Sequence, residues 1–159
     1  MMLSLIAAAA LAATPPVTLS GIGDLRIGMS LAALRRLGAR REGEVEPGST
    51  CAYWRIAGRD GLGMMVVAGR LVRIDIDDAR YRTASGAHLG MSEAEVRRIY
   101  GAALSVEPHP YTGPEGHYLV YHREGAAQGL IFETSPDTQR IESMRVGTWA
   151  NVQWIEGCS

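Results

Sequence analysis

One phrase occurs twice in this chain, and it limits the possible folds more than any other feature. Residues 27–39 read IGMSLAALRRLGA and residues 89–102 read LGMSEAEVRRIYGA. Each copy has a serine before a run of helix-forming residues and a glycine after it, which is typical of a short capped helix. In the second copy Glu95 follows Ser92 by three residues, which predicts a reciprocal capping box. Helices this short are stable only when they pack on another part of the fold.

Strand-like segments follow each copy of the phrase. Residues 72–76 alternate apolar and polar side chains, which predicts a half-buried strand with one face in water. Similar segments are residues 51–56, 63–71, 117–122, 129–135 and 139–146, and residues 152–155 predict one more strand near the C-terminus. We therefore predict an α+β fold of two pseudo-repeats packed as one body, each a short helix followed by a three-stranded antiparallel meander. The first repeat covers residues 14–84, and the second covers residues 85–159 with the C-terminal strand.

The N-terminal residues predict export. Residues 3–13 form an apolar run that is too short to span a bilayer, and Ala10-Leu11-Ala12 matches a signal-peptidase site. We expect a signal peptide over residues 1–13, although a frayed apolar helix is the alternative. No cysteine follows the cleavage region, so a lipid anchor is not expected. The mature protein is therefore expected in the periplasm or outside the cell.

Export changes the interpretation of the two cysteines, Cys51 and Cys158. In an oxidising compartment two cysteines usually pair, so we predict a disulfide that ties the end of the chain to the first repeat. The alternatives are two separate thiols or a disulfide between two chains.

The second copy of the phrase also suggests a family. Gly90-Met91-Ser92 with Val96, at the start of a short helix before antiparallel strands, resembles the BamE/SmpA lipoproteins of the outer-membrane β-barrel assembly machinery. Two such units in tandem resemble the β-lactamase inhibitory proteins. The resemblance implies a secreted module that binds another protein across its sheet. The lipid-anchor cysteine is absent and the contact residues of the inhibitors cannot be placed, so no site residue is carried over.

Residues for catalysis or metal binding show no convincing pattern. His117 and His122 lie five positions apart on a predicted strand, which turns them to opposite faces and argues against shared ligation with His109. The acidic group of Asp75, Asp77 and Asp78 lacks the rest of a calcium loop. The sequence has no nucleophile elbow, phosphate loop or dinucleotide fingerprint. We therefore expect neither an enzyme nor a bound cofactor or metal.

Charge and aromatic residues give the remaining expectations. The formal net charge of -1 provides no long-range field to attract nucleic acid or an anionic membrane. Aromatic side chains in or beside the strands can serve as anchors for a protein or a sugar ring. The candidate binding surface consists of Tyr53, Tyr111, Trp149, Arg97 and Arg98, and Tyr111 is the first choice for exposure because prolines flank its loop.

Two functions are consistent with these features. The first is a periplasmic or secreted protein-binding module, either an inhibitor or an accessory of cell-envelope assembly, whose partner is another envelope or secreted protein. The second is a protein that binds carbohydrate or peptidoglycan through exposed aromatic side chains.

Overall fold

The computed structural model describes residues 13–158 except residue 45. The predicted signal peptide therefore lies outside the described residues, apart from Ala13. None of the helices in the described part is long and apolar enough to cross a membrane.

One antiparallel sheet of eight strands organises the chain. Two sets of four strands, each consecutive along the chain, meet where β7 pairs with β11, with Asp75 opposite Arg145. In spatial order the strands are β4 (Arg40–Arg41), β5 (Cys51–Arg55), β6 (Leu62–Val67), β7 (Arg70–Ile76), β11 (Ile141–Thr148), β10 (Gln128–Thr134), β9 (His117–Tyr121) and β8 (Leu104–Pro108).

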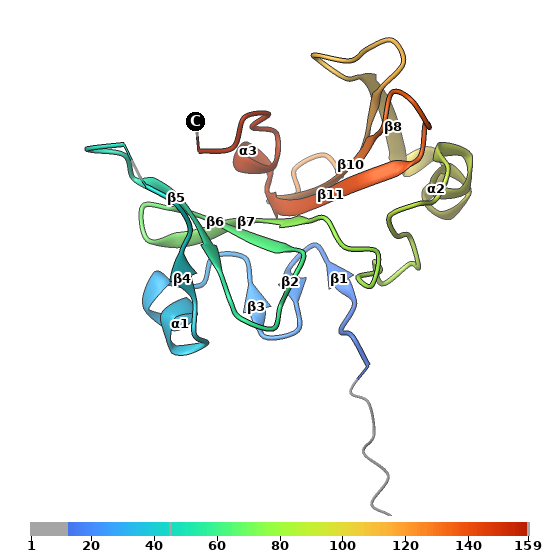
Figure 1. Ribbon diagram of the computed structural model, residues 1–159. Helices are drawn as coiled ribbons and strands as arrows, with labels where there is room; N and C mark the ends of the chain where they lie inside the picture. The colour runs from blue at the N-terminus through green and yellow to red at the C-terminus, as the bar shows by residue number, and fades with distance from the viewer. Residues whose placement is uncertain (1–12, 45, 159) are drawn as a thin grey trace, which may run out of the picture.

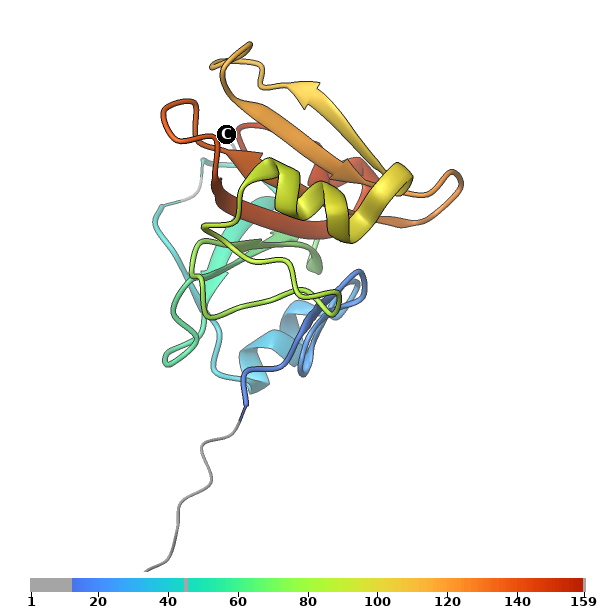
Figure 2. The same cartoon turned by 90° about the vertical axis from the view of Figure 1, so that its right-hand side faces the viewer.

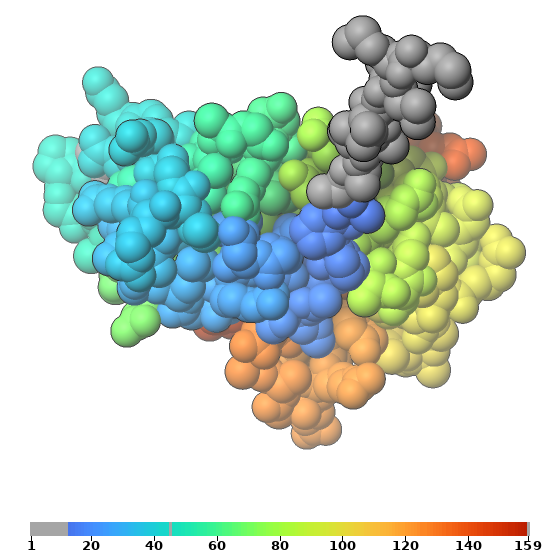
Figure 3. Space-filling view, turned by 90° about the horizontal axis from the view of Figure 1, so that it is seen from below, coloured from blue at the N-terminus to red at the C-terminus, as the bar shows by residue number. Residues whose placement is uncertain are grey.

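The main core lies on one face of this sheet. Helices α1 (Leu31–Arg36) and α2 (Glu93–Tyr100) cover this face, and their buried Leu34 and Val96 join the core cluster. A three-stranded sheet of β1 (Val17–Thr18), β2 (Gly21–Ile22) and β3 (Leu25–Arg26) covers it as well. Figure 2 shows α2 lying against the strands, and Figure 3 shows the first strands (blue) between the α1 region and the α2 region.

The predicted fold class is wrong. The chain is mainly antiparallel sheet, and its helices are short elements on a continuous eight-stranded sheet rather than parts of helix-plus-meander repeats. The strands at which the two sets meet, β7 and β11, both carry alternating apolar side chains. They therefore pair with each other and bury one common face, so neither strand is the free edge of a separate meander. The short strands of the small sheet, together with β4 and β8, have no long apolar alternation, which is why the sequence patterns missed them.

The predicted C-terminal strand is also wrong. Helix α3 (Trp149–Val152) and a turn occupy this part of the chain. A strand there would need a free sheet edge, but β7 and β11 below it are already paired on both sides. The segment therefore lies across the second face of the sheet, opposite α1 and the small sheet (Figure 1).

The local predictions for the repeated phrase are confirmed. Ser30 and Ser92 cap α1 and α2, and Ser92 and Glu95 form the complete capping box. The two copies also make matching backbone contacts: Gly28 N donates to Leu71 O and Gly90 N donates to Ile141 O, at 2.7 and 2.8 Å. Each phrase is thus held against the strand that carries the corresponding carbonyl.

Candidate functional site

The exposed large apolar side chains gather in one groove on the second face of the sheet. Tyr111, Trp154 and Ile155 are 66%, 41% and 41% exposed, and they are the large apolar side chains with high exposure among residues 13–44 and 46–158. All three line a groove with a volume of about 610 Å³. Its other lining residues are Glu46, Ser49, Cys51, Glu156, Gly157 and Cys158. We call this set the apolar groove.

Three segments that are distant in sequence form the apolar groove. They are the connection between β4 and β5, the loop over residues 109–116 between β8 and β9, and the C-terminal residues 154–158. In Figure 1 these segments rise above the sheet on the side of α3. The shape of the groove therefore depends on how residues 149–158, which we call the C-terminal strap, are fixed to the sheet.

The disulfide fixes one end of the C-terminal strap. Cys51 on β5 is bonded to Cys158, with Cα atoms 5.4 Å apart, which confirms the predicted pairing within one chain. Close by, Gly157 has φ +65, and a Cβ atom there would lie 2.7 Å from the hydroxyl of Tyr53. Glycine is therefore required at this position, because it adopts positive φ without strain and leaves room for the tyrosine.

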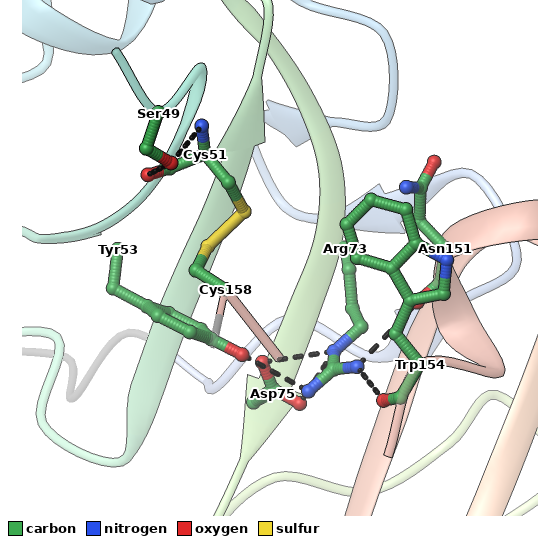
Figure 4. Close-up of a disulfide and its surroundings, with 8 residues drawn as sticks. All are labelled: Ser49, Cys51, Tyr53, Arg73, Asp75, Asn151, Trp154 and Cys158. Carbon is green, nitrogen blue, oxygen red and sulfur yellow. Dashed lines mark hydrogen bonds and ion pairs between the residues drawn. A yellow bond between two sulfur atoms is a disulfide. The ribbon is translucent and has the colours of Figure 1, made fainter. Parts of the chain in front are cut away.

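A buried arginine fixes the middle of the C-terminal strap. The Arg73 guanidinium on β7 donates to the backbone carbonyl of Trp154 at 2.6 Å and pairs with Asp75 at 2.9 Å (Figure 4). Its third nitrogen donates to the Tyr53 hydroxyl at 3.0 Å. Burial, and secondarily the negative charge of Asp75, raises the pKa of Tyr53 to about 12. Tyr53 therefore stays neutral and acts as part of the support beneath the groove.

A second buried arginine supports the start of the C-terminal strap. Arg145 on β11 donates to the carbonyl of Val152 at 2.7 Å and pairs with Glu133 at 3.2 Å. Its guanidinium carbon lies 4.7 Å from the ring centre of Tyr118, at cation–π distance. Arg145 thus connects α3 to the sheet and to Glu133, whose carboxylate also forms a hydrogen bond with His109.

His109 sets the position of the loop that carries Tyr111. Its Nδ1 accepts hydrogen bonds from the backbone N–H groups of Tyr111 and Thr112, at 3.1 and 3.2 Å. Nδ1 is therefore unprotonated, and the proton on Nε2 is donated to Glu133 across 2.9 Å. The Tyr111 hydroxyl in turn donates to the carboxylate of Glu156, which joins the loop to the C-terminal strap and raises the pKa of Tyr111.

The structure separates the residues of the predicted binding surface. Tyr111 lies in the apolar groove and is exposed as predicted. Tyr53 is half-buried beneath the strap, and half-buried Trp149 stacks on His122 with 3.7 Å between ring centres. Arg97 and Arg98 are exposed on α2, which packs on the opposite face of the sheet. The five residues therefore do not form one surface.

Several residues of the site are not predicted by the patterns in the sequence. Trp154 and Ile155 lie in the segment that the sequence predicts as a strand, and His109 stands out in the sequence only as a possible metal ligand. The alternation over residues 72–76 predicts that Arg73 faces water, but the strap buries Arg73 and Arg145 to 4% and 5% exposure. The available signal was the disulfide itself, because a bond from Cys158 to β5 requires the intervening residues to cross the sheet.

The three histidines and two aspartates, Asp75 and Asp78, of the candidate metal sites have other partners. His117 pairs with Glu93 at 2.8 Å, and the His122 ring contacts the carbonyl of Ala126 at 2.9 Å. Asp78 pairs with Arg80 at 2.8 Å. Within residues 13–158, residue 45 apart, no three His, Cys, Asp or Glu side chains converge to hold a metal ion.

The chain matches no known family model and no curated protein sequence. Its fold is similar to that of the uncharacterized protein YfeY from Escherichia coli, with a TM-score of 0.54 and 15% sequence identity. The match covers 83% of this chain and 99% of YfeY. At this identity the similarity shows a shared fold alone, and the resemblance drawn from residues 90–96 stays a prediction.

Proposed function

We propose that this chain is a secreted or periplasmic, non-enzymatic protein-binding module that contacts its partner through the apolar groove. The observation that carries the proposal is the gathering of Tyr111, Trp154 and Ile155 in one hollow of the surface. Exposed apolar side chains scattered singly are common, but a concentrated set marks an interaction site. Tyrosine and tryptophan are also the residues that most often dominate binding energy at protein interfaces.

The rigidity of the groove supports the proposal. The disulfide, the Arg73 and Arg145 hydrogen bonds and the His109 contacts hold its walls in place before any partner arrives. A pre-formed site loses less conformational entropy on binding than a mobile one. The disulfide also supports an oxidising compartment, which agrees with the predicted signal peptide.

Capture experiments with matched variants test this function. The full-length chain is immobilised and exposed to an extract of the cell envelope, in parallel with Y111A/W154A and with R98A, whose side chain is exposed on α2. We expect a partner that the wild type and R98A retain and that Y111A/W154A loses. Equal retention by all three proteins, or retention of nothing across a range of salt concentrations, would count against the proposal.

Carbohydrate binding is the second candidate. The observation in its favour is that two aromatic rings, Tyr111 and Trp154, are exposed beside the carboxylates of Glu46 and Glu156. Aromatic faces can stack on sugar rings while carboxylates accept hydrogen bonds from the hydroxyls. Sedimentation with insoluble peptidoglycan, lost in Y111A/W154A and kept in R98A, would favour this function. Binding that all three proteins share would remove the reason for it.

A further inference from the structure

The apolar groove continues into an acidic depression. A neighbouring hollow of about 250 Å³ shares Glu46, Ser49, Cys51 and Cys158 with the groove. It adds Glu42, Glu44, Ala52 and Tyr53 to the lining. The two hollows therefore form one surface that runs from Tyr111, past the disulfide, to the glutamates between β4 and β5.

The charges along this surface have one sign. The ionisable groups of its described lining that carry charge at neutral pH are Glu42, Glu44, Glu46 and Glu156, and no arginine or histidine is among them. Glu42 is partly compensated by Arg55 at 2.8 Å, in a pair whose side chains are both about half exposed. The Glu156 carboxylate accepts the hydrogen bond of Tyr111.

This local charge contrasts with the rest of the molecule. The chain as a whole has a formal net charge of only -1. Exposed arginines of α1 and α2, such as Arg35, Arg36, Arg97 and Arg98, lie on elements that cover the opposite face of the sheet. A partner in the groove therefore meets glutamates as the charged groups of the lining, and the exposed arginines of β4 and β5 lie beside Glu42 at the edge of this surface.

We propose that the groove binds a cationic peptide segment of the partner, and that basic and large apolar residues alternate or are mixed within this segment. Its apolar side chains occupy the space between Tyr111 and Trp154, and its arginines or lysines face Glu44 and Glu46. This inference rests on the proposed function and specifies the chemistry of the partner. Complementary charge at the rim of an apolar contact gives orientation and faster association, while the apolar contact supplies most of the affinity.

Three synthetic peptides of equal length test the chemistry. The first contains arginine and leucine or tryptophan residues, the second replaces each arginine by glutamate, and the third replaces each apolar residue by serine. Fluorescence anisotropy with the full-length chain is measured at low and at physiological salt. We expect binding of the first peptide only, with affinity that decreases as salt increases. Equal binding of the first two peptides would overturn the inference.

Charge-neutral variants locate the contact. E44Q/E46Q keeps the size of both side chains, and we expect it to bind the first peptide about three- to tenfold more weakly at low salt. The matched control is E124Q/E142Q, which removes the same charge from exposed positions outside the groove and should bind like the wild type. Identical affinities of the two variants would overturn the inference.

The outcomes distinguish this inference from the proposed function. Envelope capture that depends on Tyr111 and Trp154, but is unaffected by salt and by E44Q/E46Q, leaves the protein-binding function in place and rejects the cationic partner. Capture and peptide binding that are both unaffected by Y111A/W154A reject the two proposals together.

Discussion

The guanidinium of Arg73 donates a hydrogen bond to the backbone carbonyl of Trp154 across 2.6 Å. This contact joins the centre of the sheet to the segment that carries two of the three apolar side chains of the groove. The arginine is buried and also pairs with Asp75, so one side chain supports both the fold and the candidate site.

Replacement of Arg73 by methionine should lower the free energy of unfolding by about 3 kcal/mol, because it leaves Asp75 and the strap carbonyl without their partner in a largely buried place. Urea denaturation provides the measurement. The exposed Arg98→Met variant is the control and should change stability by no more than about 0.5 kcal/mol. Equal stability of the two variants would show that the buried pair contributes nothing.

Removal of the disulfide should destabilise the protein and release the C-terminal strap. Cys51 and Cys158 are separated by 107 residues, so the chain-entropy model predicts a loss of about 5 kcal/mol in C51S/C158S. Amide hydrogen exchange should become faster in residues 153–158 before it does in the sheet. Reductant should weaken the wild type and leave C51S/C158S unchanged; a wild type that is insensitive to reductant contradicts this prediction.

Tyr53 should ionise at unusually high pH. Its pKa is raised to about 12, so the neutral form is favoured in the folded state. The stabilising effect is complete below the ordinary tyrosine pKa of about 10 and is lost as the pH rises through 12. Titration of tyrosinate absorbance should show one group near pH 12 that is missing in Tyr53→Phe. A Tyr53→Phe curve identical to that of the wild type would assign the shifted group to another tyrosine.

The capping box of α2 should make stability depend on pH in the acid range. The Ser92 backbone N–H, and then the Ser92 hydroxyl, donate to the Glu95 carboxylate and hold its pKa below the ordinary value. The resulting stabilisation is complete above the ordinary glutamate pKa and is lost as the pH falls through the lowered one. Carboxyl NMR titration should give a low midpoint for Glu95 that moves upward in Ser92→Ala.

Helix α1 provides the control for this prediction. Ser30 caps it through the N–H of Ala33, and no acidic residue completes a box there. Ser30→Ala should therefore cost about 1 kcal/mol without added pH dependence between pH 3 and pH 6. A pH-dependent loss of the same size in both serine variants would contradict the role of Glu95.

The local signals in the sequence were sufficient for helices α1 and α2 and for the strands β5, β6, β7, β9, β10 and β11. Ser92, Glu95 and Gly101 specify where α2 begins and ends, because capping depends on hydrogen bonds between residues a few positions apart. Six of the seven predicted strand segments lie at β5, β6, β7, β9, β10 and β11, and the exception is the segment over residues 152–155. The pairing of Cys51 with Cys158 also followed from the sequence, because only two cysteines were present in a chain expected to be exported.

Only the tertiary structure decided the pairing of β7 with β11, the path of the C-terminal strap and the site. Alternation over residues 72–76 predicted the polar face of β7, which carries Arg73, but it could not show that residues 149–158 cover this face. Tyr111 and Trp154 come together through the disulfide, two buried arginines and His109. Such contacts join residues that are far apart in the chain. They also depend on which edges of the sheet remain free, and a local pattern of side chains contains no information about either.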